Sequence, residues 1–262
     1  MRRVAALSTL ACLTAAAETA PEAHIEAVVP RYGVFMSVGF DSVWTIHSNK
    51  LVRINPADNS VTDIPIEGAG DNWGLIAGIG LAVGEGAVWV PDVDRQVIYK
   101  VDPRTNQVSS RAAPDMAGGN GRSIGVGEGA VWVIAGTGNE LRRYSAENGS
   151  QQATIPLASA GSDVLVEFGS VWITGAGNDE LYRIDPATNQ VVATIGLHSR
   201  PRSLAAGDGS VWVFNSGDGT IDQVDGKTGK LLATIETGTA ARGTIAVGGG
   251  FVWVSTPSLS SR

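Results

Sequence analysis

Residues 84–90 read Gly-Glu-Gly-Ala-Val-Trp-Val, and residues 127–133 repeat the same seven residues. Residues 207–213 carry a third close copy, Gly-Asp-Gly-Ser-Val-Trp-Val. The dipeptide Val-Trp occurs six times, and its tryptophans are spaced by 45, 43, 40, 40 and 41 residues. These tryptophans are Trp44, Trp89, Trp132, Trp172, Trp212 and Trp253. A period near forty residues indicates an array of equal structural units.

A second block follows the tryptophan block and fixes the shape of each unit. Residues 99–108 read Tyr-Lys-Val-Asp-Pro-Arg-Thr-Asn-Gln-Val, and residues 182–191 are nearly identical. Glycine, asparagine and aspartate between short β-branched runs are typical of tight turns between strands. The fifth copy divides into four expected strands, at about 203–206, 210–214, 220–224 and 230–235.

These strands are rich in Val, Ile and Trp and show little alternation, which predicts burial on both faces. Sheets sandwiched between neighbouring sheets are typical of propeller blades. We therefore predict an all-β fold, a β-propeller of six four-stranded blades, or seven if the chain is a fragment of a longer protein. The 262 residues contain 43% hydrophobic residues and 34 glycines, which suits one propeller domain over residues 18–262. We expect a monomer.

The N-terminus is interpreted as a signal peptide over residues 1–17, so we expect a secreted or periplasmic protein. Arg2 and Arg3 precede an apolar run, and three alanines at 15–17 offer a cleavage site. The alternatives are a disordered or helical tail, or a lipidated Cys12. The run is too short to span a bilayer, so no transmembrane segment is expected.

The charge of the chain excludes one broad class of partner. The net charge is -7, and removing Arg2 and Arg3 leaves 17 basic against 26 acidic residues, or -9. Because phosphate neutralisation needs a basic surface, we expect no nucleic-acid partner.

The two ends of the domain are expected to meet. Ile25–Val29 resembles a fourth strand, and we predict that it pairs beside the final repeat, next to Ser258–Ser261 if those residues form a third strand. Such pairing removes an open sheet edge. Arg262 lies nine residues after Trp253, as Arg53 does after Trp44, so the sequence stops within a third strand. Either the last blade is short or the chain is truncated at its C-terminus.

The glycine–tryptophan and Ile-Asp-Pro-x-Thr-Asn-x-Val blocks resemble a bacterial family of forty-residue-repeat propellers. That family includes streptogramin (virginiamycin B) lyase-like proteins and YVTN-type surface and periplasmic propellers, and the resemblance covers about residues 25–262. It implies a propeller fold. The lyases of this family use histidine, glutamate and a magnesium ion, but that set does not map onto this chain residue by residue.

Few residues are candidates for chemistry. His47 and His198 follow strands at the same end of their blades and are the catalytic candidates; the alternative is two exposed loop histidines. The candidate ligand-binding residues are three arginines at the entry of innermost strands and one tryptophan in an enlarged loop: Arg122, Arg202, Arg242 and Trp73. Guanidinium groups at a channel mouth suit a carboxylate or phosphate, unless they pair with local acids.

No phosphate loop, zinc spacing, nucleophile elbow or calcium loop occurs in the sequence, so no metal site is assigned. We expect a propeller that binds a small anionic ligand or a protein partner on the face with the enlarged loop, without a cofactor. The alternative is a streptogramin lyase-like carbon–oxygen lyase that uses a rim histidine and Mg²⁺. A histidine bonded to Asp or Glu over the channel favours the enzyme, and scattered histidines favour binding.

Overall fold

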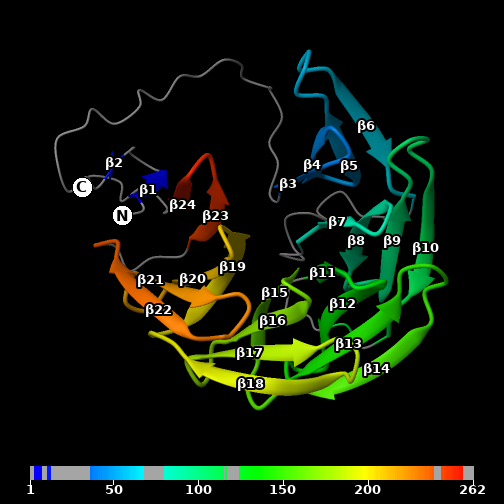
Figure 1. The fold of residues 1–262 in the computed structure, drawn as a ribbon. Helices are drawn as coiled ribbons and strands as arrows, with labels where there is room; N and C mark the ends of the chain where they lie inside the picture. The colour runs from blue at the N-terminus through cyan, green and yellow to red at the C-terminus, as the bar shows by residue number, and fades with distance from the viewer. Residues whose placement is uncertain are drawn as a thin grey trace. The chain divides into compact units, whose positions relative to one another are not determined.

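The computed structural model describes residues 36–67, 80–114, 116, 124–238 and 243–255, with the backbone of residues 3–7 and 11–12. Within these residues every regular element is a strand, and the strands form six four-stranded sheets (Figure 1). The prediction of an all-β chain of six four-stranded units is confirmed. The chain divides into two compact units, Ile25–Pro156 and Met1–His24 with Leu157–Arg262.

The first unit holds sheets 1 to 3, each an antiparallel succession of four strands. Sheet 1 contains β3 (Met36–Gly39), β4 (Ser42–His47), β5 (Lys50–Ile54) and β6 (Val61–Pro65). Sheet 2 contains β7 (Ala82–Gly84), β8 (Ala87–Asp92), β9 (Val97–Val101) and β10 (Val108–Ala112). Sheet 3 contains β11 (Ile124–Gly127), β12 (Ala130–Ala135), β13 (Glu140–Ser145) and β14 (Gln151–Pro156).

The second unit holds sheets 4 and 5, which follow the same order. Sheet 4 contains β15 (Gly161–Glu167), β16 (Ser170–Gly175), β17 (Glu180–Asp185) and β18 (Gln190–Gly196). Sheet 5 contains β19 (Pro201–Gly207), β20 (Ser210–Asn215), β21 (Thr220–Asp225) and β22 (Leu231–Glu236). The four strands expected in the fifth copy are therefore present, with ends that differ by one or two residues.

Sheet 6, also in the second unit, differs from the other five. Its first two strands are β23 (Thr244–Gly248) and β24 (Phe251–Ser255). The next strand is β1 (Arg3–Leu7), which pairs parallel with β24, and β2 (Ala11–Cys12) completes the sheet. The predicted partners Ile25–Val29 and Ser258–Ser261 lie outside the described residues, so that pairing stays a prediction.

The six tryptophans occupy equivalent positions, as the period predicts. Each lies in the second strand of its sheet, and each indole N–H donates to the carbonyl of the residue five positions earlier, at 2.9–3.3 Å. Five are at most 3% exposed, and Trp253 is partly buried. The indole N–H thus ties the second strand to the end of the first.

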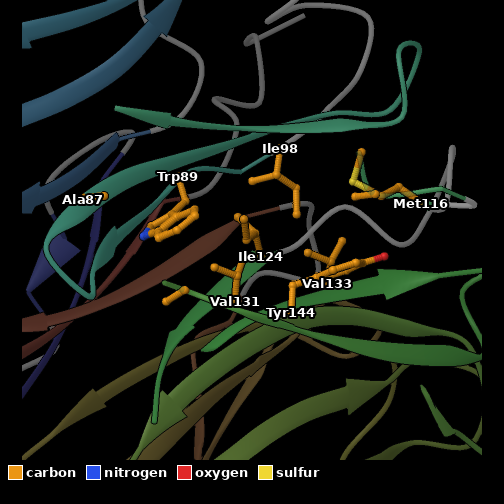
Figure 2. Packing of buried hydrophobic residues seen from close by; sticks show 10 residues of the cluster. Ala87, Trp89, Ile98, Met116, Ile124, Val131, Val133 and Tyr144 are labelled. Atoms are coloured by element: carbon orange, nitrogen blue, oxygen red, sulfur yellow. The ribbon is translucent and has the colours of Figure 1, made fainter. Parts of the chain in front are cut away.

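The cores lie between successive sheets of one unit. Trp89 and Ile98 of sheet 2 face Ile124, Val131 and Val133 of sheet 3 (Figure 2). Equivalent clusters join sheets 1 and 2, sheets 4 and 5, and sheets 5 and 6. Because both faces of a sheet are covered, every residue of β8, β12, β16 and β20 is buried.

Two features bring successive sheets together: a glycine that ends a first strand, and a basic side chain of a third strand that reaches the next sheet. Glycines that end first strands leave room for a valine of the following sheet: a Cβ on Gly207 would lie 2.2 Å from Val247 Cγ1. Basic side chains of third strands stack 4.9–5.3 Å over the tryptophan of their own sheet; these are Arg53, Lys100, Arg143 and Arg183. Arg183 also donates to the carbonyl of Lys227 in the next sheet, at 2.9 Å.

The turn between third and fourth strands recurs from sheet to sheet. The side chain of Asp102 accepts from the N–H of Arg104, and Asp185 accepts in the same way from Ala187. Asn106 and Asn189, four residues after these aspartates, have positive φ. The Asp-Pro-x-Thr-Asn block is therefore a turn motif, since Asp caps the turn and Asn tolerates the left-handed conformation.

Candidate functional site

Of the predicted site residues, the structure describes His47, His198 and Arg202. His47 is the last residue of β4 in the first unit. His198 and Arg202 lie close together in the second unit, where the chain passes from sheet 4 to sheet 5. Arg122, Arg242 and Trp73 lie outside the described residues, so their grouping stays a prediction.

Residues 197–202, called the 197–202 linker here, are held by three carboxylates. The N–H of His198 donates to Asp222 at 2.9 Å. The next two N–H groups, of Ser199 and Arg200, donate to Asp218 at 3.1 Å and to Asp179 at 2.7 Å. Asp179 comes from sheet 4 and the other two acids from sheet 5, so the linker is tied to both sheets.

The linker carbonyls are held as well. Arg200 O accepts from the N–H of Ser216, and Ser199 O accepts from the N–H of Gly217, both at 2.9 Å. A Cβ on Gly217 would lie 2.5 Å from Ser199 Oγ, so this close approach requires glycine. The linker backbone is therefore fixed before any ligand arrives.

His198 is oriented by a buried carboxylate. Its Nδ1 lies 3.0 Å from Asp222 Oδ1 and 3.2 Å from Oδ2. Because a carboxylate only accepts, Nδ1 carries the hydrogen and Nε2 is the basic nitrogen. The His198 side chain is 44% exposed whereas Asp222 is fully buried. This arrangement suits proton acceptance or, once the ring is protonated, contact with an anion.

Asp222 is saturated by donors. Besides His198 N and Nδ1, it accepts from Asn215 Nδ2 at 2.9 Å and from Thr234 Oγ1 at 2.7 Å. Four donors stabilise a buried anion, since an unpaired charge at this depth is costly. Asn215 Oδ1 is buried and without a hydrogen-bond partner within the described residues.

Two exposed arginines accompany His198. Arg200 has φ of 55°, in the left-handed region that non-glycine residues rarely adopt. Arg202 lies where the β19–β20 register shifts between Pro201 and Ser203, a bulge that turns a side chain out of the ladder. Both side chains are exposed. The structure thus brings two sequence candidates, His198 and Arg202, onto one fixed linker and adds Arg200.

The position of Asp222 holds the preceding linker in other sheets too. In sheet 4 the equivalent residue is Tyr182, whose hydroxyl lies 3.0 Å from Ser159 Oγ. Burial raises the pKa of Tyr182, which keeps the hydroxyl neutral. In sheet 3 the equivalent Arg142 donates to the carbonyl of Pro114. Fastening a linker is therefore a repeated structural role, and a His–Asp pair is one version of it.

Sequence reasoning missed Asp222 and Arg200, although one signal was present. Aligned by their tryptophans, Ile98-Tyr99-Lys100 and Leu181-Tyr182-Arg183 correspond to Ile221-Asp222-Gln223. A buried acid where two other copies carry tyrosine marks a departure that packing alone does not explain. Arg200 has no comparable signal, because its left-handed backbone depends on tertiary contacts.

The lyase resemblance implies a magnesium ion, which takes oxygen ligands such as carboxylates. Across the described ranges, no group of three or more His, Cys, Asp or Glu residues is arranged to hold a metal ion. The described side chains therefore do not fit the magnesium ion. The described residues also contain no helix long and apolar enough to cross a bilayer.

Comparisons with known proteins establish the fold. No protein-family model matches the sequence, and no curated protein matches it. Among solved structures, a streptogramin B lyase superposes with a TM-score of 0.70 at 18% identity, covering 87% of this chain and 76% of that one. The Pan2 WD40 domain of Neurospora crassa gives 0.66 at 10% identity, covering 87% and 80%. The computationally designed Ika8 protein gives 0.62 at 13%, covering 84% and 69%. With the six sheets, these likenesses show that the chain is a β-propeller.

Proposed function

We propose that this β-propeller is a secreted or periplasmic protein that binds a small anionic ligand at the 197–202 linker. The observation that carries the proposal is the fixed linker backbone, which presents His198, Arg200 and Arg202 within five residues. Binding residues are commonly found on loops that a rigid scaffold positions. Here the scaffold consists of two sheets and three carboxylates.

The three acids that hold the linker are engaged in hydrogen bonds of their own. Asp179, Asp218 and Asp222 each accept from a linker N–H group, and Asp222 accepts from side chains as well. Asp222 is buried, whereas both arginines are exposed. Guanidinium groups offer paired N–H donors that match carboxylate or phosphate. A protonated His198 adds a third donor through Nε2.

The test uses inorganic phosphate as the probe, followed by the chemical shifts of the linker amides at low salt. Arg200→Gln and Arg202→Gln are expected to weaken phosphate binding about fivefold or more each, because a charge-assisted contact is lost. Arg104→Gln is the matched control: it removes the same charge from an 87% exposed side chain on a turn of the first unit. An equal loss of phosphate affinity in all three variants would mean that binding depends only on the net charge of the protein, and it would overturn the proposal.

A second candidate function rests on the His198–Asp222 pair. A lyase would use His198 Nε2 to take a proton from carbon while the neighbouring carbon–oxygen bond breaks, leaving an alkene and an oxyanion. Asp222 would keep Nδ1 protonated and stabilise the imidazolium, as a buried acid does beside a catalytic histidine. The repeated fastening role of the Asp222 position favours the binding function.

The lyase candidate is tested with a streptogramin B macrolactone and added Mg²⁺, followed by mass spectrometry. Ring-opened product that disappears in His198→Gln would establish the enzyme and displace the binding proposal. Because a lyase conserves mass, the product is identified by its fragments. Unchanged substrate with the wild-type chain leaves binding as the function of the linker.

A further inference from the structure

A polar hollow lies on the first sheet, in the first unit. It has a volume of about 330 Å³ and is lined by Asp41, Ser42, Arg53, Asn55, Ser60 and Thr62. Arg53 and Thr62 are directly opposite each other in the β5–β6 ladder, and Trp44 is opposite Arg53 in the β4–β5 ladder. Residues opposite one another share a face of the sheet, so Trp44, Arg53 and Thr62 form one row beneath the hollow.

Arg53 is fixed in this row. Its guanidinium stacks 5.1 Å over the Trp44 ring, and Nε donates to Ser42 Oγ at 2.8 Å. Nη1 donates to Pro103 O at 2.6 Å and to Asn106 Oδ1 at 3.3 Å. Nη2 has no hydrogen bond within the described part of the chain, so the N–H groups of Nη2 on an immobilised guanidinium are left for a ligand. Such preorganisation lowers the entropy cost of binding.

The rest of the lining is rich in donors. Asn55 Oδ1 accepts from the N–H of Ala57 at 3.0 Å, and Nδ2 makes no hydrogen bond to a described residue. Ser60 and Thr62 are exposed and each carries a hydroxyl group, and the Ser60 side chain also hydrogen-bonds Asp58. Asp41 is the single carboxylate of the lining. The N–H donors of Arg53 and Asn55 suit an oxyanion. The carboxylate of Asp41 accepts hydrogen bonds, so the ligand must also carry a hydrogen-bond donor such as a hydroxyl group.

The equivalent positions of other sheets show what is particular to the first. Asn55 occupies the turn position that Asp102, Asp185 and Asp225 fill elsewhere, where the acid caps the turn in the same way. A carboxylate at this place would repel an anion beside Arg53. In sheet 4 the residue opposite Arg183 is Ala193, which lies next to a register shift. In sheet 1 the residue opposite Arg53 is Thr62, and the pairing there is regular. Sheet 1 thus combines the basic residue with an amide and a hydroxyl.

We propose that this hollow binds a small polyhydroxy carboxylate, with its carboxylate on Arg53 Nη2 and Asn55 Nδ2 and its hydroxyls toward Asp41, Ser60 and Thr62. The site shares no residue with the 197–202 linker and does not depend on its function. It lies at the end of sheet 1 that carries the turns at 40–41 and 55–60, opposite the end at which β6 finishes at Pro65.

The experiment measures binding by isothermal titration, with the Asn55 side-chain amide resonance as a local readout. D-gluconate is the probe, acetate offers only the carboxylate, and sorbitol offers only hydroxyls. Gluconate is expected to bind at least about tenfold more tightly than either, since only gluconate satisfies both halves of the lining. Equal affinities for gluconate and sorbitol, or no shift of the Asn55 amide, would overturn the proposal.

Three variants separate the site from the fold. Asn55→Asp keeps the turn cap that three other sheets use and is expected to lower gluconate affinity at least about tenfold through repulsion. Arg53→Lys removes the Nη2 donors from the hollow, whereas Arg183→Lys makes the same exchange over the tryptophan of sheet 4 and serves as the control. Unchanged affinity in Asn55→Asp, or equal losses in Arg53→Lys and Arg183→Lys, would contradict the proposal. Gluconate binding should persist in Arg200→Gln, because Arg200 belongs to the 197–202 linker and not to the hollow. This result distinguishes binding in the hollow from binding at the linker.

Discussion

At the scale of the residue, Asp222 is a side chain whose replacement should be costly, because it is fully buried and accepts four hydrogen bonds. Replacing it by Asn turns one of its two acceptor oxygens into a donor that faces His198 and Asn215. We expect Asp222→Asn to lower the free energy of unfolding by about 2–4 kcal/mol, because buried donors lose their partner. Urea denaturation followed by tryptophan fluorescence measures this.

The matched control is Asp102→Asn. Asp102 caps an exposed turn, and Asn55 fills the same position in sheet 1 with the same bond. The control should change stability by less than about 0.5 kcal/mol. Equal costs in the two variants would mean that the network around Asp222 adds nothing to stability.

Asp218 predicts a dependence on pH. Burial opposes its ionisation, but hydrogen bonds from the Ser199 N–H and from Thr220 hold the pKa of Asp218 below its usual value. An acid whose pKa is lower in the folded state stabilises the fold above the unfolded pKa, and this stability is lost as the pH falls through the folded value. The urea midpoints of wild type and Asp218→Asn should therefore differ at pH 7 and converge toward about pH 2. A constant difference would contradict this reading.

At the scale of the element, glycine at the end of a first strand sets how closely the next sheet approaches. We expect Gly207→Ala to destabilise the chain by about 1–3 kcal/mol, because its Cβ would lie 2.2 Å from Val247 Cγ1. Adding Val247→Ala should restore part of the loss, so the double variant costs less than the sum of the two singles.

Gly196→Ala is the control for this cycle. A Cβ at Gly196 meets nothing within 4 Å, and its φ is not in the left-handed region, so the change should be close to neutral. Strictly additive costs for Gly207 and Val247 would show that the two residues do not press on each other.

The elements were largely predictable from sequence, because their signals are local and repeated. Tryptophan period, turn residues and β-branched runs predicted four strands in each copy, and in the fifth copy their ends agree with the structure to within two residues. The site was predictable only in part. His198 and Arg202 stood out as residue types, but their setting depends on Asp222 and Asp218, some twenty residues further along the chain. Because these contacts between a linker and a later strand are not repeated with the forty-residue period, the sequence pattern does not predict them.

At the scale of the whole molecule, the sequence and the structure give different accounts of what completes the last sheet. The sequence predicts cleavage after residue 17 and pairing of Ile25–Val29 with the final repeat. The structure pairs β1 with β24 in parallel, although the third strand of the other five sheets is antiparallel. Trp253 is partly exposed, whereas the other five periodic tryptophans are buried. A strand that covers this edge should therefore matter to the stability of the chain.

Two shortened chains decide between these accounts. We expect a chain that begins at Glu18 to melt within about 2 °C of the full-length protein, because residues 1–17 are read as a removable targeting segment. A chain that begins at Arg31 should melt at least about 5 °C lower, because an open edge costs neighbour contacts and exposes backbone groups. Calorimetry measures both. A large loss on removing residues 1–17 alone would instead assign the completing strand to β1, and the signal-peptide interpretation would then be wrong.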